Sequence, residues 1–121
     1  MHEMGLARQL VAASIEAANR QQVRRIAAVA VEVSPLAAVD IEELQECFAL
    51  AARGTAAEAA SLQVERLPLA AVCRKCGERV TLDATAGVLG SCSKCGSESL
   101  EIPPMADWRV VAVEPAIDRL A

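Results

Sequence analysis

Four of the five cysteines stand in two pairs that share one spacing. The pairs are Cys73-x-x-Cys76 and Cys92-x-x-Cys95, with fifteen residues between them, and a glycine follows each second cysteine. This pattern is typical of a site in which four thiolates bind one Zn²⁺ ion. Since four protein ligands leave no coordination position for water, we expect this zinc to be structural rather than catalytic.

Three other interpretations of these cysteines are weaker. Iron in a rubredoxin-like site uses similar thiolate pairs, but residues 70–102 contain no aromatic side chain to pack around it. A redox dithiol needs only one C-x-x-C pair, so the doubled spacing favours a metal. Disulfides would leave one cysteine unpaired and are rare in reducing compartments. The fifth cysteine, Cys47, falls on the apolar face of a predicted helix, where we expect a small buried hydrophobe rather than a ligand.

The single histidine, His2, lies beside the α-amine of Met1. That amine, the deprotonated backbone nitrogen of His2 and its imidazole can chelate one ion through fused five- and six-membered rings. Glu3 can supply a fourth donor through its backbone nitrogen or its carboxylate. Such a tetragonal N/O set suits Ni(II) or Cu(II). One histidine is a weak motif by itself, and the alternative is an arbitrary polar residue in a frayed terminus.

Size and charge narrow the classes of protein to which the chain can belong. Its 121 residues, 54% of them hydrophobic, are enough for one compact domain with a small appended module. A net charge of -4 repels phosphate backbones, which argues against general nucleic-acid binding. No apolar run approaches the roughly 20 residues that a membrane span requires, and no signal peptide is expected. We therefore expect a cytoplasmic protein without a membrane span.

Hydrophobic periodicity predicts the first helix and the first strand. Apolar residues at helical spacing predict a helix from Glu3 to about Asn19. The expected apolar positions of this helix are Leu6, Leu10, Val11, Ile15 and Ala18. Alternation over residues 23–33, ended by Ser34-Pro35, predicts a strand with one buried face. Its expected buried residues are Val23, Ala27, Val29, Val31 and Val33.

A second helix and two more strands follow. Asp40 is the expected N-cap of the second helix, with Glu43 completing a capping box and Gly54 ending the segment. Residues 61–68 and 108–115 alternate and close at a proline, which predicts two further strands.

These elements predict an α+β fold, with two helices packed on a small three-stranded sheet and a four-cysteine, zinc-ribbon-like module inserted before the last strand. The helix and sheet domain is expected to comprise residues 1–69 and 103–114, and the zinc module residues 70–102. The module holds four of the six glycines and no aromatic residue, so we expect it to form no apolar core of its own. Residues 115–121 form a tail without an assigned role.

The order of these features resembles the HypA-type hydrogenase maturation nickel metallochaperones. The chain has Met1-His2-Glu3-Met4, then helix, strand, helix and strand, then two C-x-x-C-G motifs before a final strand, so the match spans residue 1 to about 114. Residues 53–65, RGTAAEAASLQVE, are also similar to the segment that leads into the second strand of the family. The chain departs from the family at Gly5, where we expect a serine as helix N-cap.

The resemblance implies nickel at Met1, His2 and Glu3, and zinc at Cys73, Cys76, Cys92 and Cys95. It also implies delivery of metal rather than catalysis, so the chain is not expected to be an enzyme. Such proteins work with a maturation GTPase and hand Ni(II) to the large subunit of [NiFe] hydrogenase. In some organisms they also help urease, which makes the urease maturation proteins a second expected set of partners.

Two other functions would fit parts of the sequence. A zinc-ribbon interaction or regulatory module without nickel would gain support from a basic stripe near the cysteines. Basic and acidic residues are balanced there, however, as Arg74, Lys75, Arg79 and Lys94 against Glu78, Asp83, Glu98 and Glu101. A small hydrolase would need a nucleophile, a base and an open metal site, and no such set is recognisable in the sequence.

Overall fold

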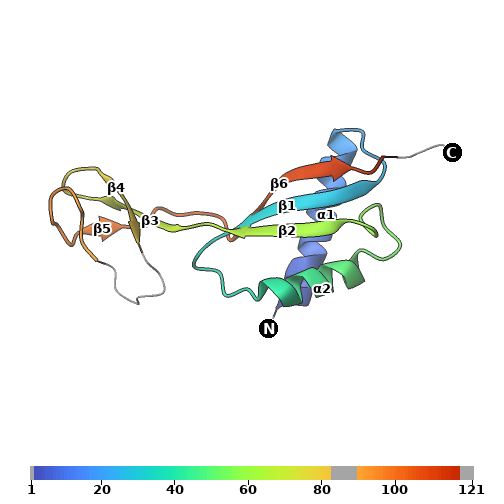
Figure 1. Ribbon diagram of the computed structural model, residues 1–121, viewed down its shortest axis with the longest axis horizontal. Helices are drawn as coiled ribbons and strands as arrows, with labels where there is room; N and C mark the ends of the chain where they lie inside the picture. Colours follow the sequence, from blue (N-terminus) through green and yellow to red (C-terminus); the bar gives the residue numbers. More distant parts are fainter. Residues whose placement is uncertain (1, 83–89, 118–121) are drawn as a thin grey trace. The chain divides into compact units, whose positions relative to one another are not determined.

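The structure is a computed structural model that describes residues 2–82 and 90–117 (Figure 1). The chain divides into two compact units. Within the described residues, the helix–sheet unit comprises 2–32, 38–65 and 108–117, and the cysteine unit comprises 33–37, 66–82 and 90–107. That the helix and sheet domain and the zinc module fold independently, with the boundaries given above, stays a prediction.

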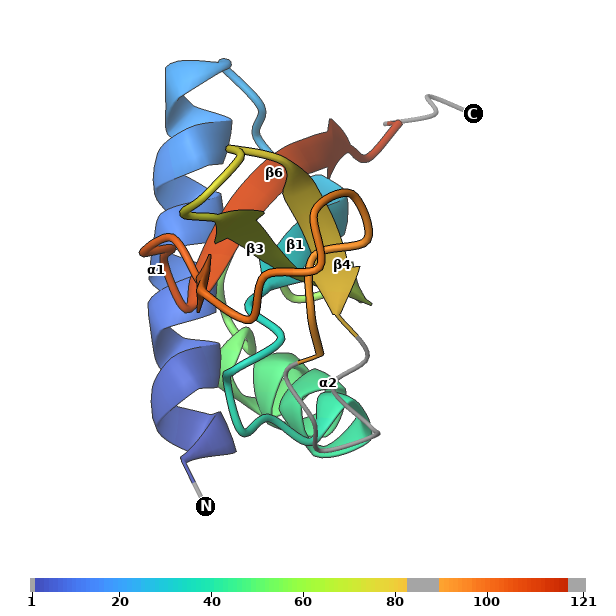
Figure 2. The ribbon, with the colours of Figure 1, turned by 90° about the vertical axis from the view of Figure 1, so that its left-hand side faces the viewer.

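The helix–sheet unit has the predicted architecture. Its elements are α1 (Glu3–Arg20), β1 (Ile26–Val33), α2 (Ile41–Ala51), β2 (Ser61–Arg66) and β6 (Trp108–Pro115). The strands form one sheet in the order β2-β1-β6. Helix α1 packs against both α2 and β6 and lies on one side of the sheet (Figures 1 and 2). The predicted fold class is therefore confirmed.

Backbone hydrogen bonds at the two ends of β1 fix the directions of its neighbours. The N–H of Ser34 donates to Asp107 at one end and the N–H of Ala116 donates to Arg25 at the other, so β6 runs antiparallel to β1. On the other side of β1, the N–H of Ile26 at its beginning donates to Ala56, and Val33 at its end accepts the N–H of Leu67. Strand β2 lies between residues 56 and 67, so it runs parallel to β1. Helix α2 is thus the crossover of a strand–helix–strand unit.

The buried face of α1 is shifted from the predicted one. Leu10, Val11 and Ala18 are buried as expected, whereas Leu6 and Ile15 are only partly buried. Glu3, Ala7 and Ser14 complete the buried face instead. The hydroxyl of Ser14 donates to the carbonyl oxygen of Leu10 at 2.6 Å, which satisfies a polar group inside the core.

Burial along β1 follows the prediction only in its second half. Val29, Val31 and Val33 are buried, but the predicted inward position Ala27 is exposed while Ile26 and Ala28 are buried. The expectation of one buried face from residue 23 onward is therefore wrong. The reason is tertiary: the N–H of Ile26 donates to Ala56, so the segment that precedes β2 shields the beginning of β1.

Helix α2 begins as predicted but lacks half of the predicted capping box. The carboxylate of Asp40 accepts the N–H of Glu43 at 3.1 Å, as an N-cap should. The N–H of Asp40 itself donates to the carboxylate of Glu3 at 3.0 Å, so Glu3 takes the position expected for Glu43. Gly54 has a φ of +77° and lies in the turn after the helix, which ends at Ala51.

Glu3 is therefore a buried carboxylate that joins the beginning of α1 to the beginning of α2. Glu3 is only 5% exposed. The backbone N–H of Asp40 favours the ionised form and lowers the pKa of Glu3 to about 2.

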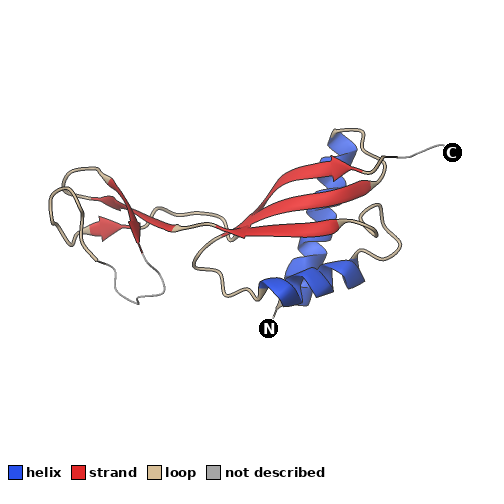
Figure 3. Cartoon of the chain, viewed as in Figure 1, coloured by secondary structure: helices blue, strands red, loops and turns tan. Residues whose placement is uncertain are grey.

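The cysteine unit has a small antiparallel sheet of its own. Strand β3 (Leu69–Cys73) lies between β4 (Arg79–Leu82) and β5 (Leu100–Glu101), and Ala71 pairs with Val80 (Figure 3). Val80 packs with Cys73 and Cys92, and Leu82 and Leu100 lie against this cluster. The expectation that this region forms no apolar core is wrong, because the β3–β4 hairpin places alternate apolar side chains beside two cysteines.

Within the two described stretches, 2–82 and 90–117, neither helix combines the length and the apolar character that crossing a bilayer demands.

Two leucines on α2 provide a matched test of the core. Leu44 is fully buried and Leu50 is 50% exposed. Leu44→Ala should lower the free energy of unfolding by about 2 to 5 kcal/mol because it leaves a cavity. Leu50→Ala removes the same atoms from the surface and should cost less than about 0.5 kcal/mol. Urea denaturation of both variants measures the difference, and equal losses would contradict this core.

Glu3 should make the stability of the chain depend on pH. Its folded-state pKa lies below the ordinary 4.5, so its contribution is fully present above about pH 4.5 and is lost as the pH falls towards about 2. Glu3→Gln keeps an oxygen acceptor but cannot titrate. The variant should therefore lose less stability than the parent protein between about pH 5 and pH 3.

Urea unfolding of metal-free protein at both pH values provides the measurement. Glu16→Gln, at an exposed position of the same helix, is the control and should follow the parent. Parallel pH profiles for the parent and Glu3→Gln would show that the ionised carboxylate does not stabilise the fold.

Candidate metal centre

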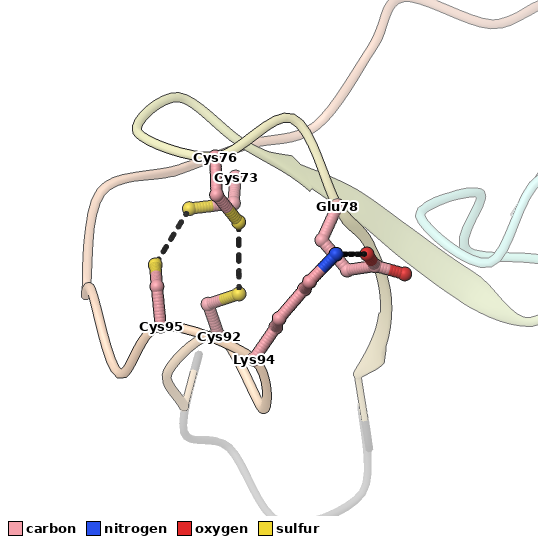
Figure 4. Close-up of polar contacts among 6 residues, drawn as sticks. All are labelled: Cys73, Cys76, Glu78, Cys92, Lys94 and Cys95. Carbon is pink, nitrogen blue, oxygen red and sulfur yellow. Dashed lines mark hydrogen bonds and ion pairs between the residues drawn. The ribbon is translucent and has the colours of Figure 1, made fainter.

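The four paired cysteines converge on one point in the cysteine unit (Figure 4). Their sulfur atoms all lie within 4.8 Å of one another. The Sγ atoms of Cys73 and Cys95 are 3.5 Å apart, and those of Cys76 and Cys92 are 3.6 Å apart. A disulfide would require about 2.05 Å, whereas Zn–S bonds of about 2.3 Å put neighbouring thiolates of a tetrahedron roughly 3.8 Å apart. The observed separations fit four thiolates around one ion.

Each pair of cysteines is held by the same backbone turn. In the first turn the N–H of Gly77 donates to the carbonyl of Cys73, and in the second the N–H of Gly96 donates to that of Cys92, both at 2.8 Å. The two glycines have φ values of +79° and +77°, in the left-handed region that side chains disfavour. The glycine after each C-x-x-C pair is therefore required by the turn that aims the two thiols.

Backbone N–H groups in these turns stabilise negative charge on sulfur. The N–H groups of Cys76 and Lys75 lower the pKa of Cys73 to about 6. The matching groups of the second turn, led by the N–H of Cys95, lower the pKa of Cys92. The first cysteine of each pair is thus prepared to act as a thiolate, the form that binds metals.

Cys76 shows why four such groups need a cation. The N–H of Glu78 favours its thiolate, but desolvation and the neighbouring sulfurs of Cys92 and Cys73 outweigh this and raise the pKa of Cys76 to about 12. Without a metal, Cys76 keeps its proton at neutral pH. A bound dication would displace it, because a thiol must be deprotonated to act as a ligand.

The first and second cysteines of each pair differ in exposure. Cys73 and Cys92 are 1% and 2% exposed, whereas Cys76 and Cys95 are exposed. The buried thiols belong to the apolar cluster with Val80, so the donor set is anchored on one side by packing. An exposed ion pair between Lys94 and Glu78, 3.5 Å apart, joins the two turns and adds little to stability (Figure 4).

Cys47 lies elsewhere. It is half-buried on α2 in the helix–sheet unit and is not among the four clustered thiols. Among the described residues, these four thiols form the only group of three or more Cys, His, Asp or Glu side chains that could hold an ion.

His2 is the N-cap residue of α1. It is exposed, and its side chain makes no capping hydrogen bond, while its carbonyl accepts the N–H of Leu6 at 2.9 Å. The helix therefore begins directly after the imidazole, and the N-cap position expected at Gly5 is wrong. Met1 lies outside the described residues.

As a ligand for a metal ion, the backbone nitrogen of Glu3 is more available than its carboxylate. The carboxylate is buried and accepts the N–H of Asp40, as described above. This bond was not predicted from the sequence, although Glu3 shares helical spacing with the buried residues Ala7 and Leu10, which places it on the inner face of the helix.

Comparison with known proteins matches this arrangement over nearly the whole chain. The family described as "Hydrogenase/urease nickel incorporation, metallochaperone, hypA" matches residues 1–114. The hydrogenase maturation factor HypA of Azotobacter chroococcum is 37% identical over 114 residues, covering 94% of this chain and 98% of the relative. That of Azotobacter vinelandii is 35% identical with the same coverage.

A solved structure with a similar fold is the solution structure of the Ni metallochaperone HypA from Helicobacter pylori. It is 23% identical in sequence to this chain and superposes with a TM-score of 0.67. The match covers 98% of this chain and 100% of the chain in that structure. Family, relatives and fold agree with one another and with the four-thiol cluster. The chain therefore belongs to the HypA family of nickel metallochaperones that take part in hydrogenase maturation, and it is not an enzyme.

Proposed function

We propose that this chain binds Ni(II) at its N-terminus and delivers it during [NiFe] hydrogenase maturation, while the four clustered cysteines hold a structural Zn²⁺. The match to the nickel incorporation family from residue 1 onward carries this proposal. The exposed imidazole of His2 supports it, because that side chain is engaged in no helix cap.

The nickel site consists of the α-amine of Met1, the backbone nitrogen and imidazole of His2, and a donor from Glu3. The backbone nitrogen of Glu3 is the favoured fourth donor, since its carboxylate accepts the N–H of Asp40. The first three nitrogens lie nearly in one plane, and a donor from Glu3 completes an N/O set of the kind that suits Ni(II). An ion held at an exposed chain end with few donors can pass to a partner by ligand exchange.

The zinc site consists of Cys73, Cys76, Cys92 and Cys95. Sulfur donors with separations of 3.5 and 3.6 Å support a tetrahedral ion, and four thiolates close its coordination sphere. Binding of such an ion contributes on the order of 10 kcal/mol to ordering its surroundings. This zinc is structural: it holds the two turns together, and it exchanges no ligands while nickel is transferred.

The partners that follow are a maturation GTPase and the large subunit of [NiFe] hydrogenase, in the cytoplasm. Urease maturation proteins are a second set of partners, in keeping with the family description. A zinc-ribbon interaction module without nickel is the alternative. In the described part of the cysteine unit, Arg74 pairs with Glu101 and Lys94 with Glu78, which reduces the free positive charge that such a module would use.

Nickel titration of zinc-loaded, untagged protein tests the terminal site. The parent protein should bind one Ni(II). Loss of a residue that only supports a metal ligand weakens metal binding by up to roughly 100-fold, so His2→Ala, which removes a ligand itself, should weaken nickel binding by more than that. Acetylation of the α-amine should have a similar effect, because it removes a basic donor. Arg8→Ala, at an exposed position on α1, is the matched control and should bind nickel as the parent does.

Calorimetry measures the affinities, and metal analysis confirms that zinc stays in place. Acetylated protein that binds nickel as tightly as the parent would exclude the amine as a ligand. A chain that retained zinc and bound no nickel in any form would be the interaction module instead.

Removal of one cysteine tests the zinc site and the division into domains. Cys76→Ala should reduce the zinc content from one ion per chain to near zero, because three thiolates no longer close the sphere. Amide signals of β3, β4 and β5 should then lose their dispersion, while those of α1 and β1 remain. Cys47→Ala, which removes a thiol outside the cluster, should retain zinc and an unchanged spectrum. Loss of all secondary structure in Cys76→Ala would contradict independent folding of the helix and sheet domain.

A further inference from the structure

One face of the sheet in the helix–sheet unit has no helix on it. In Figure 3, α1 passes behind the strands, and no described element of this unit passes in front of them. Two adjoining depressions of about 220 and 250 Å³ lie on this open face and share Ala30 and Gln63. They span all three strands, since their linings come from β1, β2 and β6.

The floor of these depressions is apolar and made of small side chains. Ala28 and Ala30 of the central strand lie there together with Val111 and Val113 of β6. Val111 is 50% exposed, so part of this apolar floor is open to solvent. The alanine side chains of the central strand are short, so a partner element can approach the sheet closely there.

Acidic side chains surround this floor. Glu32, Glu65 and Glu114 line the depressions, and they contain no lysine or arginine. Arg109 on β6 bonds Glu32 at 2.8 Å, so this base is already neutralised. Among the described residues, Glu65 and Glu114 have no oppositely charged partner. The rim therefore carries uncompensated negative charge.

We infer that the open face of the β2-β1-β6 sheet binds an amphipathic helix of a partner protein whose apolar stripe is flanked by lysine or arginine. The apolar floor favours the stripe through burial of nonpolar area, and the acidic rim selects its basic flanks. Self-association through the same face is disfavoured, since two acidic rims would meet. This surface is distinct from both metal sites, and the inference does not depend on the nickel assignment.

Two synthetic peptides test the inference on full-length, zinc-loaded protein. Both are about 18 residues long, which is long enough to hold a helix in water, and both carry a Leu/Ala stripe. The first has lysine at every flanking position, and the second has glutamate instead. Titration of each into isotopically labelled protein, followed by amide chemical shifts, reports affinity and location together.

The lysine peptide should bind and shift the amides of residues 28–32, 63–65 and 109–113. The glutamate peptide should bind at least about tenfold more weakly, since it loses attraction to both uncompensated rim charges and is repelled by them. Ala30→Arg should weaken the lysine peptide about tenfold by obstructing the floor. Ala12→Arg makes the same substitution on the exposed surface of α1 and should leave binding unchanged.

The rim is tested separately, because Ala30→Arg could also disturb the strand. Glu65→Lys should weaken the lysine peptide by up to about fivefold and narrow its advantage over the glutamate peptide. Glu46→Lys, an equal charge change at an exposed position of α2, is its control. Equal binding of both peptides, binding of neither, or shifts confined to other residues would overturn the inference. Shifts of the open face that depend on protein concentration without peptide would assign the face to a second copy and overturn it too.

Discussion

The hydrogen bond from the N–H of Asp40 to the carboxylate of Glu3 joins the first residue of α1 to the cap of α2. Much of the helix–sheet unit depends on it, because α1 and α2 pack against each other and this bond fixes where both begin. His2, the N-cap of α1, comes immediately before this anchored residue. The same bond satisfies a charged group within the packed interface, where an unpaired carboxylate would be costly.

The cysteine cluster has a comparable role in the second unit. Val80, Leu82 and Leu100 form too small a cluster to stabilise three short strands alone. Two thiols that are themselves part of this cluster connect it to the group of four thiols. The packed residues and the candidate metal ligands therefore overlap, and neither the apolar contacts nor the thiol geometry is independent of the other.

The sequence predicted these two regions to different degrees. The four thiols could be placed together because C-x-x-C spacing and the following glycines constrain the chain locally, and both glycines have the required positive φ. The number and order of helices and strands in the helix–sheet unit also followed from periodicity. The role of the Glu3 carboxylate did not, because its partner lies 37 residues away and the bond exists only once the helices pack. Burial at Ile26 escaped prediction for the same reason, since a distant segment shields it. The small core around Val80 was missed because its strands are too short to show a period.

The connections between the two units have a consequence for proteolysis. Most of the cysteine unit is one stretch, residues 66–107, which follows β2 and leads into β6. This stretch is an insertion with two covalent attachments rather than a terminal extension. A single cut within it would leave one fragment that carries β2 and another that carries β6, and both would remain associated through the shared sheet. Only paired cuts, one near each end of the stretch, would release the cysteines as a separate piece.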